Sequence, residues 1–208
     1  MDFGKWGSLI DIFLAKNSQI NLSAIRDTEW VYVKHILDSL ELLKIFSFTA
    51  GQRVCDLGTG WGFPLLPLAI EQPDVRFVGM DARKKKITAI QEMINEYKTD
   101  PLELKNVHLL WARVEEYKGV KFDVVLARAV AHVDILIPWM LAIVKKGGTL
   151  VLYKEYKEEE KKVLVDLCVQ KKLTIEKEYR YVLEGSGPAA SDGVNVERVI
   201  YVIEFSGK

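Results

Sequence analysis

Residues 53–81 read RVCDLGTGWGFPLLPLAIEQPDVRFVGMD, and this stretch decides the fold. A short apolar run is followed by a loop with three glycines, then by a helical run and a second apolar run that ends at Asp81. This order of strand, glycine loop, helix, strand and acidic residue is typical of an open α/β sheet. Such sheets bind adenosine-containing ligands at the carboxyl ends of their strands, so we expect the binding site there.

The spacing of the glycine loop indicates which ligand it binds. Gly58, Gly60 and Gly62 alternate along the loop, whereas a dinucleotide-binding turn usually reads G-x-G-x-x-G beside a pyrophosphate. Asp56 precedes the loop, and a buried carboxylate repels a phosphate but attracts a sulfonium and an amino group. These features favour S-adenosylmethionine, with Asp81 placed to accept hydrogen bonds from its ribose hydroxyls. The alternative is an ordinary tight turn in which both acids cap helices.

Strand-like and helix-like patterns alternate along the chain after residue 53. The helical patterns cover 64–71, 84–97, 133–144 and 157–171, and the strand-length apolar runs cover 54–57, 76–80, 107–111, 122–127 and 149–153. This alternation predicts a parallel sheet with helices on both faces. The helices then form the crossovers that parallel strands require.

The two ends of the chain have different patterns. Residues 2–16 and 27–46 carry apolar side chains at helical spacing, and Asp27 is a candidate N-cap of the second helix. Residues 173–183 and 196–205 read as two strands joined by the loop EGSGPAASDGVN. Two strands joined in this way predict an antiparallel hairpin at the edge of the sheet.

Composition limits the number of domains and the partners. The 208 residues, 49% of them hydrophobic, suffice for one domain over 1–208, with a helical segment (1–48) before a Rossmann-like core (49–208). Basic and acidic residues number 29 each, so only a local basic patch can attract a nucleic acid. Cys55 and Cys168 lie far apart in core-like segments, as reduced thiols of a cytoplasmic protein do. We find no signal segment and no apolar run near the roughly 20 residues of a membrane helix.

Longer blocks of the chain resemble the RsmG (GidB) family, bacterial S-adenosylmethionine-dependent methyltransferases that modify N7 of a guanine in 16S ribosomal RNA. The blocks are NLSAIRD (21–27), HILDSL (35–40), VCDLGTGWGFPLLPLAI (54–70), GMDARKKK (79–86), ARVEEY (112–117), FDVVLARAVA (122–131), Lys154 and ERVIYVIE (197–204). The resemblance implies the class I methyltransferase fold, a seven-stranded Rossmann-like sheet with its last strand antiparallel, preceded by helices. The segment before residue 21 is about one helix shorter than in many members.

The resemblance also implies site residues. Its cofactor contacts fall on Gly58, Phe63, Val114, Glu115 and Arg128, and the strand-end positions of Gly60 and Asp81 add these two. Arg128 directly follows the fourth strand, where this class of enzyme places the methyl acceptor, so it is also the expected catalytic residue. The alternative for Arg128 is a surface salt bridge, and for Val114 and Glu115 an ordinary loop.

Basic residues around the expected cleft are candidates for RNA contact. The candidate substrate-binding residues are Arg83, Lys84, Arg113 and Lys154, and Lys145 and Lys146 are expected to extend the patch. A solvated basic surface is the alternative. His35, Asp38 and Ser39 share one face of the second helix by their spacing, which fits either substrate contact or a polar network that ties this helix to the sheet.

The chemistry of the acceptor follows from what the strand ends lack. No cysteine nucleophile stands at an expected strand end, and ARAV replaces the D/N-P-P-Y segment of exocyclic-amine methyltransferases. Guanine N7 already has an in-plane lone pair and needs mainly to be positioned. Together with this, the resemblance implies a monomeric enzyme that acts on 16S ribosomal RNA in a small-subunit particle or precursor, and we expect no metal. The alternatives are a methyltransferase of the same fold for a small molecule or protein, and a non-catalytic S-adenosylmethionine-binding or ribosome-binding module.

Overall fold

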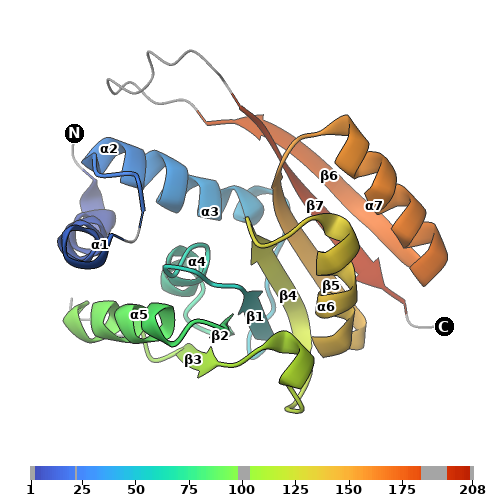
Figure 1. The fold of residues 1–208 in the computed structure, drawn as a ribbon, viewed down its shortest axis with the longest axis horizontal. Coiled ribbons are helices and arrows are strands. Elements are labelled where there is room, and N and C mark those ends of the chain that lie inside the picture. Colours follow the sequence, from blue (N-terminus) through green and yellow to red (C-terminus); the bar gives the residue numbers. More distant parts are fainter. Residues whose placement is uncertain (1–2, 22, 98–103, 184–195, 207–208) are drawn as a thin grey trace.

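A seven-stranded sheet in the order β3-β2-β1-β4-β5-β7-β6 forms the centre of the molecule (Figure 1). The computed structural model describes residues 3–21, 23–97, 104–183 and 196–206. The strands are β1 (Arg53–Leu57), β2 (Arg76–Asp81), β3 (Val107–Trp111), β4 (Phe122–Arg128), β5 (Val144–Glu155), β6 (Leu173–Val182) and β7 (Glu197–Phe205). β1 to β5 are parallel, and β7 runs antiparallel to both β5 and β6.

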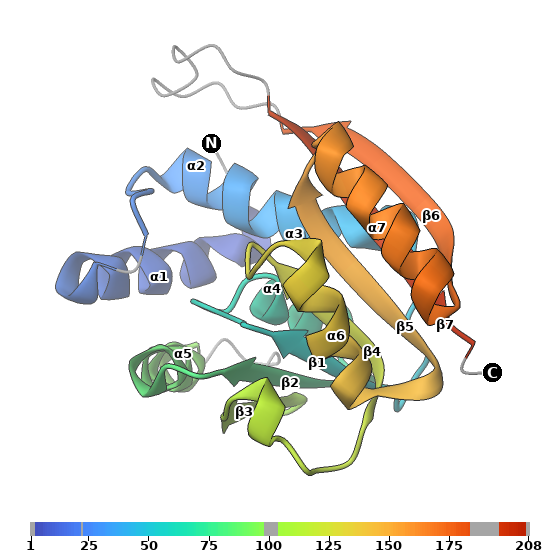
Figure 2. The same cartoon turned by 45° about the vertical axis from the view of Figure 1, so that its right-hand side comes forward.

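Helices cover both faces of the sheet, as expected from the alternating pattern. The helices of the core are α4 (Leu65–Glu71), α5 (Lys84–Glu96), η4 (Val114–Glu116), α6 (Val133–Ile143) and α7 (Glu158–Lys171). Successive residues of β1 point to opposite faces, so Val54 packs with α4 and α5 whereas Cys55 packs with α6 and α7. Figure 2 shows α6 and α7 together on one face. Both faces of the central strands β1 and β4 are therefore buried, which explains their continuous apolar runs.

The N-terminal segment adds helices to the face that α4 and α5 cover. These are η1 (Gly4–Trp6), α1 (Gly7–Ile20), α2 (Thr28–Val31), η2 (Tyr32–Leu37), α3 (Asp38–Leu40) and η3 (Glu41–Lys44). The Asp27 carboxylate accepts from the Trp30 N–H at 3.0 Å, which confirms it as the cap of α2. Leu9, Phe13 and Ile36 are fully buried in the same core cluster as α4.

The C-terminal hairpin is confirmed for its two strands. β6 pairs with β7 from Leu173 opposite Phe205 to Val182 opposite Glu197, and β6 forms the edge of the sheet. The loop predicted between them, residues 184–195, lies outside the described residues. Of the helices described, none is long and apolar enough to cross a membrane.

Both cysteines are free and buried, as expected of core thiols. Burial raises the pKa of the Cys55 thiol well above its ordinary value. Cys55 lies inside β1, and Cys168 lies in α7. Neither thiol therefore stands at a strand end.

Candidate functional site

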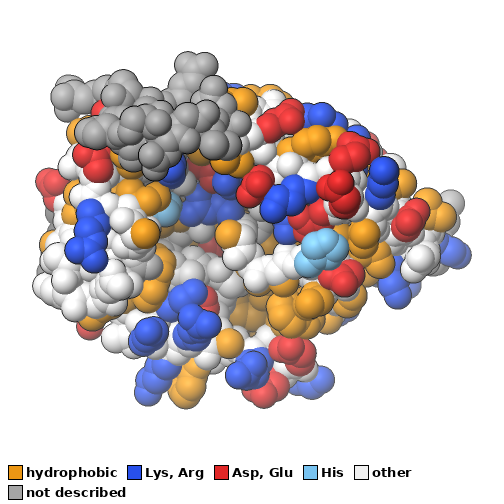
Figure 3. Space-filling view, turned by 45° about the horizontal axis from the view of Figure 1, so that its top comes forward, with side chains coloured by type: hydrophobic (Ala, Val, Ile, Leu, Met, Phe, Trp, Pro, Cys, Tyr) orange, Lys and Arg blue, Asp and Glu red, His pale blue; other side chains and the backbone are white. Residues whose placement is uncertain are grey.

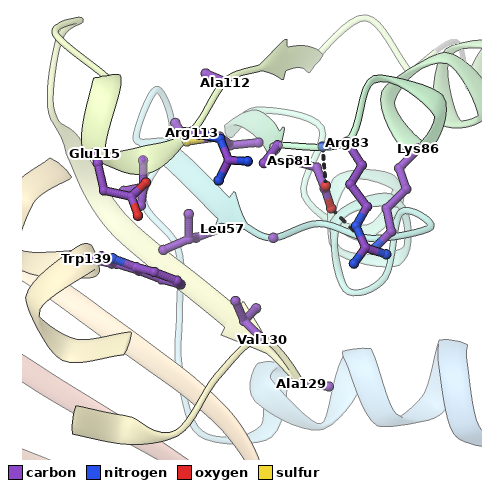
Figure 4. Close-up of a pocket in the computed structure, with 14 residues that line it drawn as sticks. Leu57, Asp81, Arg83, Lys86, Ala112, Arg113, Glu115, Ala129, Val130 and Trp139 are labelled. Carbon is purple, nitrogen blue, oxygen red and sulfur yellow. Dashed lines mark hydrogen bonds and ion pairs between the residues drawn. The ribbon is translucent and has the colours of Figure 1, made fainter. Parts of the chain in front are cut away.

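A cavity of about 440 Å³ opens at the carboxyl ends of the parallel strands, where β1 lies between β2 and β4. This is the point at which the order of an open α/β sheet reverses and where such sheets bind ligands. The lining residues are Leu57, Gly58, Met80, Asp81, Ala82, Arg83, Lys86, Ala112, Arg113, Val114, Glu115, Ala129, Val130 and Trp139 (Figure 4). Figure 3 shows a hollowed face of the molecule with Lys and Arg side chains around the hollow.

The glycine loop is held against the neighbouring strands. The backbone N–H groups of Gly58 and Thr59 both donate to the Met80 carbonyl, at 2.8 and 3.0 Å. Gly58 has φ +70°, and a Cβ at this position would lie 2.7 Å from a γ-carbon of Val130. Only glycine fits this backbone and this close approach, so the loop after β1 can pack directly on the loop after β4.

Asp81 links the glycine loop to the start of α5. Its carboxylate accepts from the Gly60 N–H at 3.1 Å and from the Arg83 N–H at 2.9 Å. The Lys86 ammonium lies 3.5 Å from the same carboxylate (Figure 4). A carboxylate has about four acceptor positions, so Asp81 keeps capacity to accept from hydroxyls of a bound ligand.

Asp56 is buried at the end of β1 without a well-formed hydrogen bond. Neither of its carboxylate oxygens has a partner in hydrogen-bond geometry among the described residues, and the same holds for the Thr59 hydroxyl. Burial raises the pKa of Asp56 to about 6, although nearby Thr59 and the Arg128 charge oppose this effect. A buried carboxyl group without a full set of partners is suited to a cationic ligand group.

The donor set fits the S-adenosylmethionine expected from the sequence. Asp81 lines the cavity and supplies acceptors for hydroxyls. Asp56 does not line it, but its buried carboxyl lies one residue before the lining residue Leu57 and supplies negative charge nearby. Val114 and Glu115 line the cavity beyond β3, where an apolar side chain and a carboxylate suit a flat heterocycle with an amino group. The Trp139 indole forms a further wall from α6 (Figure 4), and sequence reasoning missed it because it falls within an apolar helical run.

Three of the residues expected to contact the cofactor, Gly60, Phe63 and Arg128, lie outside the lining of this cavity. Phe63 is buried and stacks on His35, with ring centroids 4.8 Å apart and planes 14° apart. Arg128 donates to Asp38 at 2.8 Å and to the Lys34 carbonyl at 3.1 Å. Both side chains therefore connect the strand-end loops to η2 and α3.

Asp38 is the centre of a buried polar network. Of the two interpretations of the face that carries His35, Asp38 and Ser39, this confirms the polar network that ties the helix to the sheet. Besides the Arg128 guanidinium, Asp38 accepts from Arg198 at 3.0 Å and from the Tyr181 hydroxyl at 2.7 Å. Burial, followed by the Arg128 charge, lowers the pKa of His35 to about 3, so its imidazole is neutral. The network joins the N-terminal segment to β4, β6 and β7.

The basic candidates fall into three groups. Arg83 and Arg113 line the cavity, whereas Lys84 lies over the Trp111 ring, 5.1 Å from its centroid. Lys154 is only 13% exposed because it donates to the Ala131 carbonyl at 2.9 Å and pairs with Glu160 at 2.6 Å.

The expected extension of the patch to Lys145 and Lys146 is wrong. Lys145 pairs with Asp123 at 2.6 Å, beside the first residues of β4 and β5. The amino ends of parallel strands lie at the opposite edge of the sheet from the cavity. Both lysines precede the strand expected at 149–153 and lie among the first residues of the observed strand, which begins at Val144, so either boundary places them at the amino end of β5.

Sequence comparison relates the chain to one group of proteins. The family described as "GidB: rRNA small subunit methyltransferase G" matches residues 5–182. A protein named ribosomal RNA small subunit methyltransferase G from Lachnoclostridium phytofermentans is 41% identical over 155 residues, covering 72% of this chain and 62% of the relative. One of the same name from Lysinibacillus sphaericus is 32% identical over 204 residues, covering 93% and 79%. Several relatives are matched over only about three fifths of their length, for example 62%, 60% and 58%.

Structural comparison identifies the fold. A SAM-dependent methyltransferase from Aquifex aeolicus superposes with a TM-score of 0.60 at 17% identity, covering 92% of this chain and 98% of the other. A SAM-dependent O-methyltransferase from Thermotoga maritima gives 0.60 at 13% identity, covering 91% and 70%. The expected class I methyltransferase fold, with its last strand antiparallel, is therefore confirmed.

Proposed function

Because the chain belongs to the rRNA small subunit methyltransferase G family, we propose that it transfers a methyl group from S-adenosylmethionine to N7 of a guanine in 16S ribosomal RNA. The observation that carries the proposal is the cavity at the β1 strand end, which is lined by Asp81, Val114 and Glu115. The buried Asp56 carboxyl, one residue before the lining residue Leu57, adds negative charge next to it. A cationic methyl donor bound in the cavity would be attracted by this nearby carboxylate. Asp81, on the adjacent strand end, would accept from the donor's hydroxyls.

The remaining chemistry would be mostly orientation. S-adenosylmethionine supplies an electrophilic methyl group on a sulfonium, and guanine N7 supplies the lone pair. Neither cysteine lines the cavity, and β4 ends at Arg128 and is followed by Ala129 and Val130 rather than by a D/N-P-P-Y segment. These residues are compatible with an acceptor atom that needs no protein nucleophile and no group to draw off an amine lone pair. The chain's task is then to hold the acceptor in line with the methyl group.

Arg128 remains our candidate for the catalytic and cofactor-contacting residue at the end of β4. The Asp38 carboxylate and the Lys34 carbonyl fix its guanidinium beside η2, at the helical side of the cleft. We expect the Arg128→Ala variant to lose turnover. Its thermal unfolding must be measured in parallel, because the variant also removes a partner of the buried Asp38.

The proposed partner is 16S ribosomal RNA within a small-subunit particle or its precursor, and the protein would act as a monomer in the cytoplasm. With equal numbers of basic and acidic residues, the chain has no overall attraction to RNA. A structured particle would gather more local contacts than a short RNA can. If short hairpins were methylated as fast as subunits, the particle would not be required.

The function is tested by incubating the protein with labelled S-adenosylmethionine and small subunits from a strain that lacks its own enzyme of this family. We expect label in 16S ribosomal RNA, and mapping of the modified base should locate it at N7 of a guanine. Label in a protein or a small molecule would overturn the RNA substrate. Binding of S-adenosylmethionine without transfer to any fraction would leave a binding module.

A further inference from the structure

An aromatic side chain stands exposed at the rim of the cavity. Trp111 ends β3 and pairs in register with Asp81, so it lies at the same edge of the sheet as the candidate site. Its surface is 57% exposed, although a large aromatic residue is usually buried. Its indole N–H donates to the Ala82 carbonyl at 3.1 Å, which fixes the orientation of the ring. The exposed ring is therefore preorganised.

One cationic side chain lies against this ring, and two more line the neighbouring cavity. The Lys84 ammonium lies 5.1 Å from its centroid, and more than half of the residue's surface remains exposed with Lys84 in place. Arg83 and Arg113, which adjoin Ala82 and Ala112 in the sequence, line the neighbouring cavity (Figure 4). The net charge of the whole chain is zero, so this local concentration of positive charge is a specific feature of the rim. An aromatic face among cations is a common way of binding unpaired nucleotides.

We propose that Trp111 is a stacking platform for an unpaired base of the RNA substrate, with Lys84, Arg83 and Arg113 beside it for the adjoining phosphates. The inference rests on the proposed function and names a second contact region, at the β3 end of the cleft. A base stacks on an aromatic ring whatever its identity, whereas phosphates need cations nearby. Trp111 would thus add affinity for single-stranded RNA next to the target guanine without selecting a sequence.

A structural role of Trp111 has to be separated from stacking. The hydrogen bond from its indole N–H to the Ala82 carbonyl also stabilises the turn between β2 and α5, and this turn carries Arg83. Trp111→Phe keeps a ring for stacking but removes this hydrogen bond, and Trp111→Ala removes both. Lys84→Met tests the cation next to the ring, and Lys121→Met removes the same charge near the amino end of β4 as a matched control.

The experiment measures KM and kcat for small subunits, KM for S-adenosylmethionine and thermal unfolding for each variant. We expect Trp111→Ala to raise KM for the RNA substrate about tenfold, since stacking is worth about 1–3 kcal/mol per base. We expect a smaller rise for Trp111→Phe and Lys84→Met, and unchanged values for Lys121→Met. KM for S-adenosylmethionine should stay within about twofold in all variants.

Other outcomes overturn the inference in distinguishable ways. If Trp111→Phe is as impaired as Trp111→Ala, the hydrogen bond to Ala82 matters and the stacking role is wrong. If KM for S-adenosylmethionine rises instead, Trp111 belongs to the cofactor site. If the wild-type protein methylates RNA and Trp111→Ala keeps its KM, only this inference fails. Absence of RNA methylation by the wild-type protein would remove the proposed function as well.

Discussion

The buried carboxylate of Asp56 should lower the folding stability of the ligand-free protein. Its pKa of about 6 lies above the ordinary carboxyl value, so the folded state binds the proton more tightly than the unfolded state. Folding stability should therefore decrease as pH rises from about 4 through 6. Asp56→Asn removes the buried charge, and we expect it to stabilise the ligand-free protein by about 1–3 kcal/mol at pH 8 and by little near pH 4.

The same substitution should weaken binding of S-adenosylmethionine. The wild-type affinity should fall as pH drops below about 6, because the protonated Asp56 no longer attracts a cationic group, and Asp56→Asn should lack this pH dependence. Thermal unfolding between pH 4 and 8 and titration calorimetry measure the two effects. Equal stability of both proteins at pH 8, together with equal affinity, would rule out this role.

Gly58 gives a second prediction at the residue scale. Gly58→Ala adds a methyl group 2.7 Å from Val130 on a backbone with φ +70°, so it combines a steric overlap with left-handed strain of roughly 1–2 kcal/mol. We expect Gly58→Ala to lower the free energy of unfolding by more than the backbone strain alone would, and to abolish binding of S-adenosylmethionine. Gly147→Ala is the matched control, because Gly147 has φ +72° with no atom within 4 Å of the added carbon. Similar unfolding midpoints for the two variants would show that the contact with Val130 is unimportant.

The sequence predicted the position of a site residue where that residue lies at the end of a strand or in the loop that follows it. Gly58, Asp81, Val114 and Glu115 lie beside the cavity because strand ends and the loops that follow them are visible in the sequence. Phe63 and Arg128 stay predictions for the cofactor site, since their side chains point into contacts with the N-terminal segment. The direction of a long side chain depends on tertiary partners that no local pattern contains.

The loop after β4 is an element that other elements hold in place. Ala129 has φ +54°, a conformation rare for a residue with a side chain. Lys154 from β5 donates to the Ala131 carbonyl, and Glu160 from α7 accepts from the Val133 N–H at 3.1 Å and pairs with Lys154. Two partly buried charges thus fix the wall of the cavity opposite β2. From this arrangement we infer that Lys154 positions the loop, and its predicted contact with RNA stays a prediction.

The role of Lys154 is tested by the dependence of RNA binding on salt concentration. A lysine that contacts phosphate should reduce the salt slope by about one when it is removed, whereas a positioning lysine should leave it unchanged. We expect Lys154→Met to keep the slope, lower kcat and cost about 1–3 kcal/mol of stability by leaving Glu160 without its partner. A double-mutant cycle with Glu160→Gln measures the coupling. A reduced slope at unchanged stability would restore the expected phosphate contact.

Elements were predicted well in kind and less well in extent. The parallel strands, the crossover helices and the hairpin follow from apolar periodicity, which burial on both faces of the sheet imposes. β5 begins at Val144 rather than near residue 149 because Val144 pairs with Phe122 of β4, and an irregularity separates this pair from the regular register that starts with Thr149 opposite Val124. Such pairing depends on a neighbour distant in sequence, so no local signal marks it.

The whole molecule shares one core between the N-terminal helices and the sheet. Trp6, Phe13 and Ile36 of the N-terminal segment pack in the same buried cluster as Phe77 and Val124 of the sheet. We therefore propose that residues 1–208 form a single domain. The Asp38 network crosses the same boundary with charged partners. Both contacts imply that the two parts unfold together.

Asp38→Ala tests this cooperativity, because Asp38 is 1% exposed and holds Arg128, Arg198 and the Tyr181 hydroxyl. Removing it leaves two partly buried guanidinium groups without their anion, and we expect a loss of about 3–5 kcal/mol in the free energy of unfolding. Amide hydrogen exchange should show protection falling equally in α1 and in β4. Asp11→Ala, which removes the same charge from an exposed position on α1, should change neither. If only α1 lost protection while the sheet kept it, the N-terminal helices would form a separate unit on a stable core.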